Sequence, residues 1–285
     1  MKALVLGAQG TLGSALVDQL DKSGNEVAGF SRDILDITDK ESVRARLTEL
    51  RPEVVFNCVA YNSMDRAEEE QERAFLLNKT AVENICEVVK ELGLRLVHYS
   101  TGYVFDGKAS EGYAEDAQPN PLSVYAQSKY EGEKVVLERC AKYYLIRTNL
   151  IFGPAGTSPS SKKSFPDLIL ELSNTKQSID FVTDEISSPT YSVDLAKASI
   201  ALVSEDYPYG IYHLVNEGRA SWYDYAQEVF KLANKQKVSL NAVPSSRLVR
   251  KAARPGCSVL LNTKFRKLRP WPEALREYLA ERKEQ

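Results

Sequence analysis

The chain has 285 residues, is 43% hydrophobic and carries a formal net charge of −2 at pH 7. This length and apolar content predict a large core with a smaller lobe, and the weak net charge gives no long-range attraction for nucleic acid or an anionic membrane. No apolar run approaches the roughly 18 residues that span a bilayer, and no signal-peptide pattern opens the chain. We therefore expect a cytoplasmic protein that binds neither nucleic acid nor membrane.

Short apolar runs alternate with helical periodicity through the first 150 residues. We expect Thr38 to cap the second helix, because acidic residues follow it. The alternation predicts parallel β-α-β units in an α/β fold, a Rossmann-type doubly wound parallel sheet. The predicted strands cover 3–6, 27–30, 54–58, 96–99 and 144–147, and the predicted helices cover about 12–23, 39–50, 66–92 and 122–141.

The second half of the chain predicts a smaller C-terminal α/β substrate lobe. Residues 153–163 are rich in Gly, Pro, Ser and Thr, which indicates a mobile loop beside a site. Beyond it we expect helices at about 165–172, 194–203, 221–233 and 272–282, and strands at 179–182 and 211–214. The predicted division is a cofactor-binding core over 1–150, to which 175–215 returns, and a substrate lobe over 151–174 and 216–285.

Metal and disulfide chemistry find little support in the composition. The four cysteines are far apart and only two histidines are present, so neither a disulfide framework nor a Cys/His metal site is predicted. We interpret the acidic run over 65–72 as a solvated helix face rather than a metal site.

A glycine-rich segment directly follows the first predicted strand and opens a helical pattern, the context that a dinucleotide fingerprint requires. Gly7 permits the tight turn, Gly10 lets the backbone approach a pyrophosphate, and Gly13 lets the helix pack closely on the strand. The spacing resembles that of extended short-chain dehydrogenases and reductases. We expect the cofactor to contact Gly7, Gln9, Gly10, Thr11, Leu12 and Gly13.

A tyrosine and a lysine lie four residues apart on the fourth predicted helix. Tyr125 and Lys129 would share one helix face, so the ammonium can lower the pKa of the phenol and also hold the nicotinamide ribose. Thr101 ends the fourth strand, where an α/β sheet presents catalytic groups, and its hydroxyl can polarise a carbonyl. Ser100 is the rival hydroxyl. These residues predict reduction of a ketone, with Tyr125 as the proton donor.

The end of the second strand predicts the choice of cofactor. Ser31 and Arg32 follow that strand, and a basic residue there accommodates the 2′-phosphate of NADPH. Asp33 is adjacent and would bond a ribose 2′-hydroxyl, so NADH stays open. The predicted cofactor is NADPH.

Further motifs extend over almost the whole chain. The strings Tyr-Val-Phe-Asp-Gly at 103–107 and Pro-Leu-Ser-Val-Tyr at 121–125 are specific among Rossmann proteins. With them the chain resembles the dTDP-4-dehydrorhamnose reductase family, which also includes the regulatory β-subunit of methionine adenosyltransferase. The resemblance also rests on 35–39, 57–61, 65–68, Asn78, 188–191 and 254–255.

The resemblance implies further site residues. Asp36 and Ile37 would flank the adenine, while Val59, Ala60 and Tyr61 would line the groove beneath the cofactor. Arg254 would grip a nucleotide-sugar diphosphate, with a surface arginine as the alternative interpretation. The implied cofactor set also includes Asn78, and the implied substrate set is Asn62, Met64, Thr101, Tyr103, Leu150 and Arg254.

Four positions depart from the family pattern, all on the substrate side. Gly102 stands where the family usually has Asp, and Leu150 stands where it has a Trp that lies against the sugar. Cys257 and Leu261 replace a usual Asn and Asp. We expect a roomier and less polar pocket than is usual in the family.

The function predicted from these residues is NADPH-dependent reduction of the 4-keto group of a nucleotide-activated 6-deoxysugar. One alternative is a non-catalytic NADP-binding regulatory subunit, and another is a nucleotide-sugar epimerase or dehydratase of the same superfamily. The sequence leaves open which sugar is reduced and whether the chain forms a homodimer.

Overall fold

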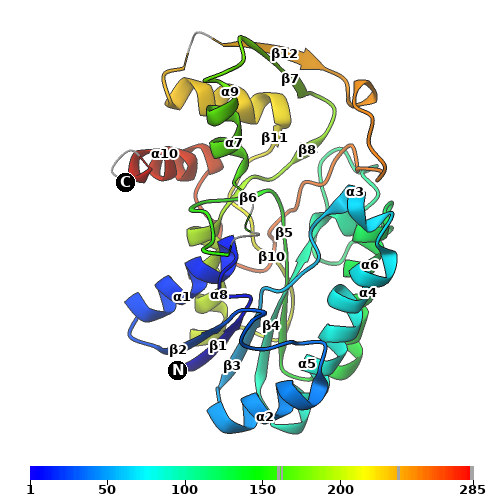
Figure 1. Ribbon diagram of the computed structural model, residues 1–285, viewed down its shortest axis with the longest axis vertical. Coiled ribbons are helices and arrows are strands. Elements are labelled where there is room, and N and C mark those ends of the chain that lie inside the picture. The colour runs from blue at the N-terminus through cyan, green and yellow to red at the C-terminus, as the bar shows by residue number, and fades with distance from the viewer. Residues whose placement is uncertain (159–160, 162, 236–237, 283–285) are drawn as a thin grey trace.

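The computed structural model describes residues 1–285 except 159–160, 162, 236–237 and 283–285. A parallel sheet in the order β10-β5-β4-β3-β1-β2 forms the centre of the molecule, which confirms the Rossmann-type prediction (Figure 1). The order reverses after β1, as in doubly wound folds, which bind ligands at the carboxyl ends of the strands. The strands are β1 (Lys2–Leu6), β2 (Glu26–Phe30), β3 (Val54–Asn57), β4 (Arg95–Thr101), β5 (Tyr143–Thr148) and β10 (Gly210–His213).

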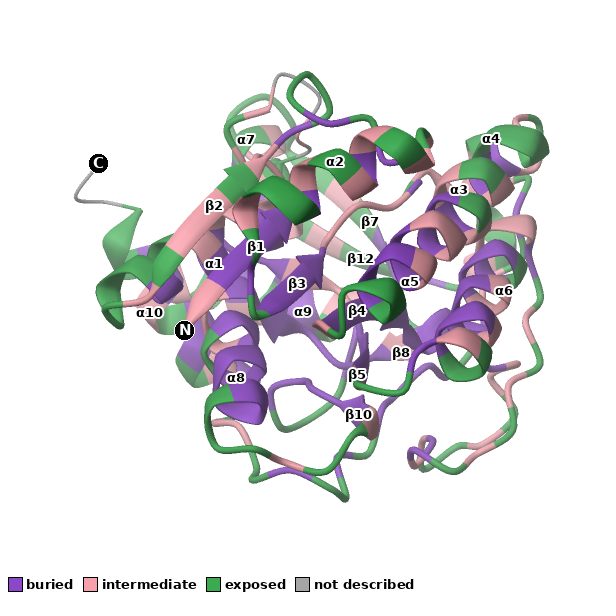
Figure 2. Ribbon diagram, turned by 90° about the horizontal axis from the view of Figure 1, so that it is seen from below, coloured by how far each residue is buried: buried purple, intermediate pink, exposed green. Residues whose placement is uncertain are grey.

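Two hydrophobic cores cover the two faces of this sheet, because successive strand residues point to opposite sides. Leu4 faces α2 (Lys40–Leu50), α5 (Ala81–Glu91) and α6 (Val124–Arg139), whereas Val5 faces α1 (Thr11–Lys22) and α8 (Ser192–Ser204). The central strands are buried and the outer sides of α2 and α6 carry exposed residues (Figure 2).

The C-terminal lobe has a separate aromatic core. Phe152, Tyr191, Tyr225 and Trp271 are buried together in it. In Figure 1 this lobe lies above the carboxyl ends of the core strands. Its helices are α7 (Phe165–Leu172), α9 (Trp222–Leu232) and α10 (Trp271–Glu281), and its strand pairs are β7 (Ser178–Val182) with β12 (Ser239–Val243), β8 (Ile186–Ser187) with β11 (Ala220–Ser221), and β6 (Ile151–Phe152) with β9 (Thr190–Tyr191).

The chain returns to the central sheet later than residue 175. β7 pairs with β12 of the lobe, whereas α8 and β10 join the core. The prediction that 175–215 returns to the core is therefore wrong for the first part of that segment, which contains β7. The pairing of β7 with β12 joins residues about 60 apart in the chain, which local periodicity does not report.

The single helix predicted over 66–92 is also wrong. The segment folds as α3 (Met64–Ala67), α4 (Gln71–Phe75), a π-helical turn η1 (Leu76–Thr80) and α5. The π turn contains Asn78, whose side chain is fully buried and hydrogen-bonded, so tertiary contacts override the local helical pattern.

The N-cap of α2 lies one residue beyond the prediction. Asp39 is the cap, and its carboxylate accepts the backbone N–H of Glu41 at 3.1 Å. Thr38 instead donates its backbone N–H and its hydroxyl to Asp36 Oδ1 at 2.9 and 2.7 Å.

Among the described helices none has the length and hydropathy to cross a membrane. The described residues also include two short 3-10 turns, η2 (Gly102–Val104) and η3 (Ser245–Arg247).

Candidate active site

The glycine-rich loop forms a tight turn between β1 and α1. Gly7 has a φ of +77°, and its N–H donates to Phe30 O at 2.8 Å. Gly10 is the N-cap of α1, and a Cβ atom on Gly13 would lie only 2.1 Å from Gly7 O. Thr11 and Leu12 begin the helix. Backbone N–H groups and the positive end of the α1 dipole therefore face the same point, as an anionic pyrophosphate requires.

The loop after β6 lies directly on this glycine-rich loop. A Cβ atom on Gly156 would lie 2.1 Å from Gln9 O, and the N–H of Ser158 donates to the same oxygen at 3.1 Å. The predicted mobile loop over 153–163 also includes 159, 160 and 162, which lie outside the described residues. The described part shows that the loop adjoins the predicted cofactor site.

The end of β2 places the predicted specificity residues beside the glycine-rich loop. Ser31 is buried, whereas Arg32 and Asp33 are exposed. The pKa of Asp36 is lowered, first by the backbone and side-chain hydrogen bonds from Thr38 and then by the charge of Arg32. Ile37 is buried in the core beneath α2. Arg32 is thus an exposed cation, without a hydrogen bond to any described residue, at the predicted position of the ribose phosphate.

The catalytic candidates meet at the carboxyl end of β4. Thr101 is buried there and Tyr125 is half-buried in the first turn of α6. Burial raises the pKa of Tyr125 to about 12, and a hydrogen bond with Thr101 acts in the opposite direction. Thr101 Oγ1 also accepts the N–H of Tyr103 at 3.2 Å. A phenol and a hydroxyl thus lie together where the sheet ends, whereas Ser100 Oγ is buried without a hydrogen-bond partner among the described residues.

Lys129 lies beneath these groups on the same helix and is only 3% exposed. Its ammonium donates to Tyr99 O at 2.6 Å. Burial lowers the pKa of Lys129 to about 8, while the charge of Glu133 acts in the opposite direction. Ser123 caps α6 by accepting the N–H of Ala126 at 3.3 Å, which fixes where the helix begins.

Asn78 connects the loop after β3 to α6 instead of facing open space. Its Nδ2 donates to Ser128 Oγ at 2.9 Å and to Tyr61 O at 3.2 Å, and its Oδ1 accepts the N–H of Tyr61 at 2.9 Å. A Cβ atom on Gly132 would lie 2.1 Å from Asn78 O, so the helix and the π turn touch through their backbones. Asn78 therefore positions the segment in which Val59, Ala60 and Tyr61 follow β3, and a Cβ atom on Gly7 would lie 3.2 Å from Val59.

The predicted substrate residues come from both lobes. Arg254 donates to both oxygens of Asp65, Nη1 to Oδ1 at 2.7 Å and Nη2 to Oδ2 at 2.8 Å. Asp65 also accepts the backbone N–H groups of Lys251 and Ala252. The interpretation of 65–72 as a solvated face is therefore wrong for Asp65, whose pKa is held well below its usual range chiefly by Arg254.

Tyr103 lies among the same charged groups. Burial and the charge of Glu185 raise the pKa of its phenol, while Arg254 lowers it. Met64 begins α3 and is half-buried, and the neighbouring Asn62 is exposed. The structure thus brings Tyr103 and Arg254 near one another, whereas neither Asn62 nor Met64 has a hydrogen bond to them among the described residues.

The expected extra space beside Gly102 is filled. Asn149 Oδ1 accepts the N–H of Gly102 at 3.0 Å, and its Nδ2 donates to Ser258 O at 2.5 Å. A Cβ atom on Gly102 would lie 2.3 Å from Asn149 Nδ2. Leu150 is half-buried and has a left-handed backbone with φ of +38°. The prediction of a roomier pocket is therefore wrong at Gly102. Asn149 follows β5 as Thr101 ends the neighbouring β4, and that placement is the signal that could have revealed it.

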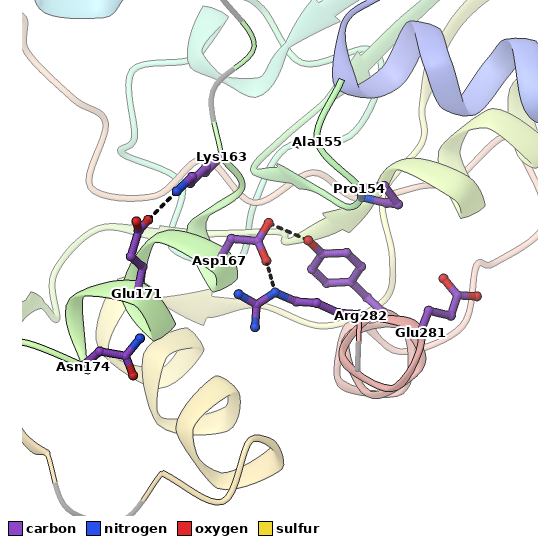
Figure 3. Close-up of a pocket in the computed structure, with 9 residues that line it drawn as sticks. Pro154, Ala155, Lys163, Asp167, Glu171, Asn174, Glu281 and Arg282 are labelled. Atoms are coloured by element: carbon purple, nitrogen blue, oxygen red, sulfur yellow. Dashed lines mark hydrogen bonds and ion pairs between the residues drawn. The ribbon is translucent and has the colours of Figure 1, made fainter. Parts of the chain in front are cut away.

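A pocket of about 530 Å³ lies elsewhere, between α7, α10 and the loop after β6 (Figure 3). Two ion pairs line it, Lys163 with Glu171 at 2.6 Å and Arg282 with Asp167 at 2.8 Å. None of the predicted site residues lines it. Across the described part of the chain, no three His, Cys, Asp or Glu side chains gather to hold a metal ion.

Comparisons with known proteins agree with this geometry. The family model described as "RmlD substrate binding domain" matches residues 1–284. The spore coat polysaccharide biosynthesis protein SpsK of Bacillus subtilis is 37% identical, covering 99% of this chain and 98% of its own. A probable dTDP-4,6-dihydroxy-2-methyloxan-3-one 4-ketoreductase of Streptomyces antibioticus is 38% identical, covering 97% of this chain and 94% of its own.

A solved structure extends the likeness to three dimensions. The dTDP-4-dehydrorhamnose reductase of Bacillus anthracis, solved in complex with NADP, is 33% identical with a TM-score of 0.93, covering 99% of this chain and all of its own. The chain therefore belongs to the dTDP-4-dehydrorhamnose reductase family of NAD(P)H-dependent oxidoreductases, as its sequence motifs predict.

Proposed function

We propose that the protein reduces the 4-keto group of a nucleotide-activated 6-deoxysugar with NADPH. The observation that carries the proposal is that Thr101 and Tyr125 lie together at the end of β4, with the buried ammonium of Lys129 one helical turn along α6 from Tyr125. These are the groups that a ketone reduction needs at the acceptor oxygen. The NADP complex of the similar Bacillus anthracis enzyme supports the cofactor.

The residues present fit a dinucleotide. The glycine-rich loop leaves its backbone open at Gly10, where a Cβ atom would have only one contact, at 3.4 Å from Gly7 O. Arg32, exposed beyond β2, would bond the 2′-phosphate, and Ser31 lies beside it. When bound, NADPH supplies the hydride. We assign the cofactor to the core, which includes α8 and β10, and the sugar to the C-terminal lobe, which includes β7.

Each side chain has a defined part at the carbonyl. The Thr101 hydroxyl donates to the carbonyl oxygen and polarises it. Tyr125 Oη then gives its proton to the developing alkoxide. The positive charge of Lys129 would stabilise the phenolate that remains and so oppose the burial that raises the pKa of the phenol. Arg254 would meet the diphosphate once its pairing with Asp65 opens.

The test is oxidation of NADPH, followed by absorbance, against a panel of nucleotide 4-ketosugars that includes dTDP-4-dehydrorhamnose. The proposal expects turnover that is saturable in one of these sugars and stereospecific at C4. Tight NADP binding without turnover of any ketosugar would overturn it and favour the regulatory subunit. Products that keep the keto group would favour an epimerase or dehydratase. Sedimentation of the same sample measures whether a homodimer forms.

A further inference from the structure

One face of α6 carries three ionisable side chains at a spacing of four residues. They are Tyr125, Lys129 and Glu133. Residues four apart on an α-helix lie one above the other, about 6 Å apart along the axis. The catalytic tyrosine, the lysine and a glutamate thus form one row that runs from the substrate side of the site into the protein.

Glu133 makes no contact with solvent. It is 0% exposed, and each carboxylate oxygen accepts from Arg147, Oε1 from Nε at 3.0 Å and Oε2 from Nη2 at 2.7 Å. Arg147 is itself buried, donates its remaining Nη1 to Glu115 O at 3.4 Å, and lies 5.1 Å from the ring centre of Phe105. The pair is enclosed by protein, so Glu133 has no path to a ligand.

The other elements packed around Lys129 bring groups that are neutral. Cys58 follows β3, and burial raises the pKa of its thiol. His98 on β4 has a pKa lowered by burial and by Lys129, and its Nδ1 is 3.1 Å from Asn57 Nδ2. Burial keeps Tyr125 protonated. Among these neighbours Glu133 is the one that supplies a negative charge.

We propose that Glu133 is a positioning residue that keeps Lys129 charged, by holding a buried carboxylate one helical turn beyond it with Arg147 as its anchor. The inference rests on the proposed function only in taking Lys129 as the partner of Tyr125. Moving an ammonium out of water favours the neutral amine, and a nearby carboxylate opposes that loss. The charged Lys129 in turn stabilises the phenolate of Tyr125. Glu133 therefore influences the proton transfer indirectly, by keeping Lys129 charged.

The test is Glu133→Gln, which keeps the shape of the side chain and removes its charge. NMR of protein labelled with ¹³C at the lysine Cε follows the titration of Lys129 without any substrate, and the Lys129→Arg spectrum assigns its signal. We expect the titration midpoint of Lys129 to fall by about one pH unit or more. On the best ketosugar, the basic limb of the kcat profile should move down by the same amount, while KM changes little.

Two further variants separate charge from folding. Glu138→Gln makes the same change at an exposed position of the same helix and should leave both titrations unchanged. Glu133→Gln with Arg147→Met removes both buried charges, so that the fold holds no unpaired guanidinium. If the Lys129 midpoint in this double variant equals the wild-type value, the inference is overturned. Wild-type protein that turns over no ketosugar contradicts the proposed function alone, because the lysine titration needs no substrate.

Discussion

The carboxamide of Asn149 occupies the space that a side chain on Gly102 would need, since a Cβ atom there would lie 2.3 Å from Asn149 Nδ2. Both polar atoms of the carboxamide are already bonded, to Gly102 N and to Ser258 O. The two positions therefore form a matched pair, and restoring the usual aspartate of the family at 102 requires a change at 149.

Gly102→Asp alone should lower the free energy of unfolding by about 1–3 kcal/mol, as overpacking of a filled core does. In the Asn149→Ala background the same change should cost less, with a coupling of about 1 kcal/mol or more. Urea unfolding of the wild type, both single variants and the double variant measures this cycle. Additive losses would show that the two side chains do not compete for the same space.

Tyr125→Phe should lower kcat on a ketosugar by about 10²–10⁴-fold, because the variant has no proton to give to the alkoxide. NADPH affinity should stay close to the wild-type value, since the phenol acts on the substrate oxygen. Steady-state turnover and titration of cofactor fluorescence measure the two effects separately. Wild-type turnover by the variant would remove Tyr125 from the mechanism.

Arg32→Ala should weaken NADPH binding more than NADH binding. A charge-assisted hydrogen bond to the 2′-phosphate is worth roughly 1.5–3 kcal/mol, and NADH has no phosphate there. Calorimetric titration with both cofactors gives the difference, and Lys22→Ala, a change at an exposed lysine at the far end of α1, is the control. Equal losses for the two cofactors would show that Arg32 is merely solvated.

Two glycines of the same loop should respond differently to alanine. At Gly13 the new Cβ would lie 2.1 Å from Gly7 O, so Gly13→Ala should destabilise the fold by about 1–3 kcal/mol. At Gly10 the contact is an ordinary 3.4 Å, so Gly10→Ala should leave the unfolding free energy almost unchanged and weaken NADPH binding. Thermal unfolding with and without NADPH distinguishes the two. The same loss of stability in both variants would contradict the distinction.

Asp106 should make stability depend on acid pH. It accepts the N–H of Lys108, the hydroxyl of Tyr113 and the amide of Asn120, and these bonds lower its pKa to about 2, with the Lys108 bond the largest cause. A folded pKa below the unfolded value of about 4 contributes stability that is present above pH 4 and is lost as the pH falls toward 2.

Asp106→Asn should therefore cost about 1–2 kcal/mol at pH 7, and the gap to wild type should close between about pH 4 and 2. Urea unfolding at several pH values measures it. Asp116→Asn, a change at an exposed aspartate nearby, serves as the reference and should leave stability unchanged. A gap that stays constant with pH would mean that the carboxylate charge has no part in it.

Local patterns predicted the strands of the sheet and the glycine-rich loop, because alternation and turn chemistry are properties of neighbouring residues. They did not predict that Arg254 pairs with Asp65, 189 residues away, or that β7 pairs with β12. They also treated 66–92 as one helix, since nothing in its periodicity reports that Asn78 bonds to Ser128. The positions of the site residues along the chain were predictable, whereas their partners depend on the folded topology.

Gly132 has no side chain that could contact a ligand, yet its substitution would displace the catalytic groups that act on the carbonyl. Any larger residue there must push α6 away from Asn78 O, which a Cβ atom would approach to 2.1 Å. Tyr125 and Lys129 belong to the same helix, and a shift of about 1 Å in a catalytic group can lower the rate by about 10²-fold. In a mutational scan scored by activity, substitutions at Gly132 should therefore lower activity about as strongly as substitutions at Tyr125, although Gly132 takes no part in the chemistry.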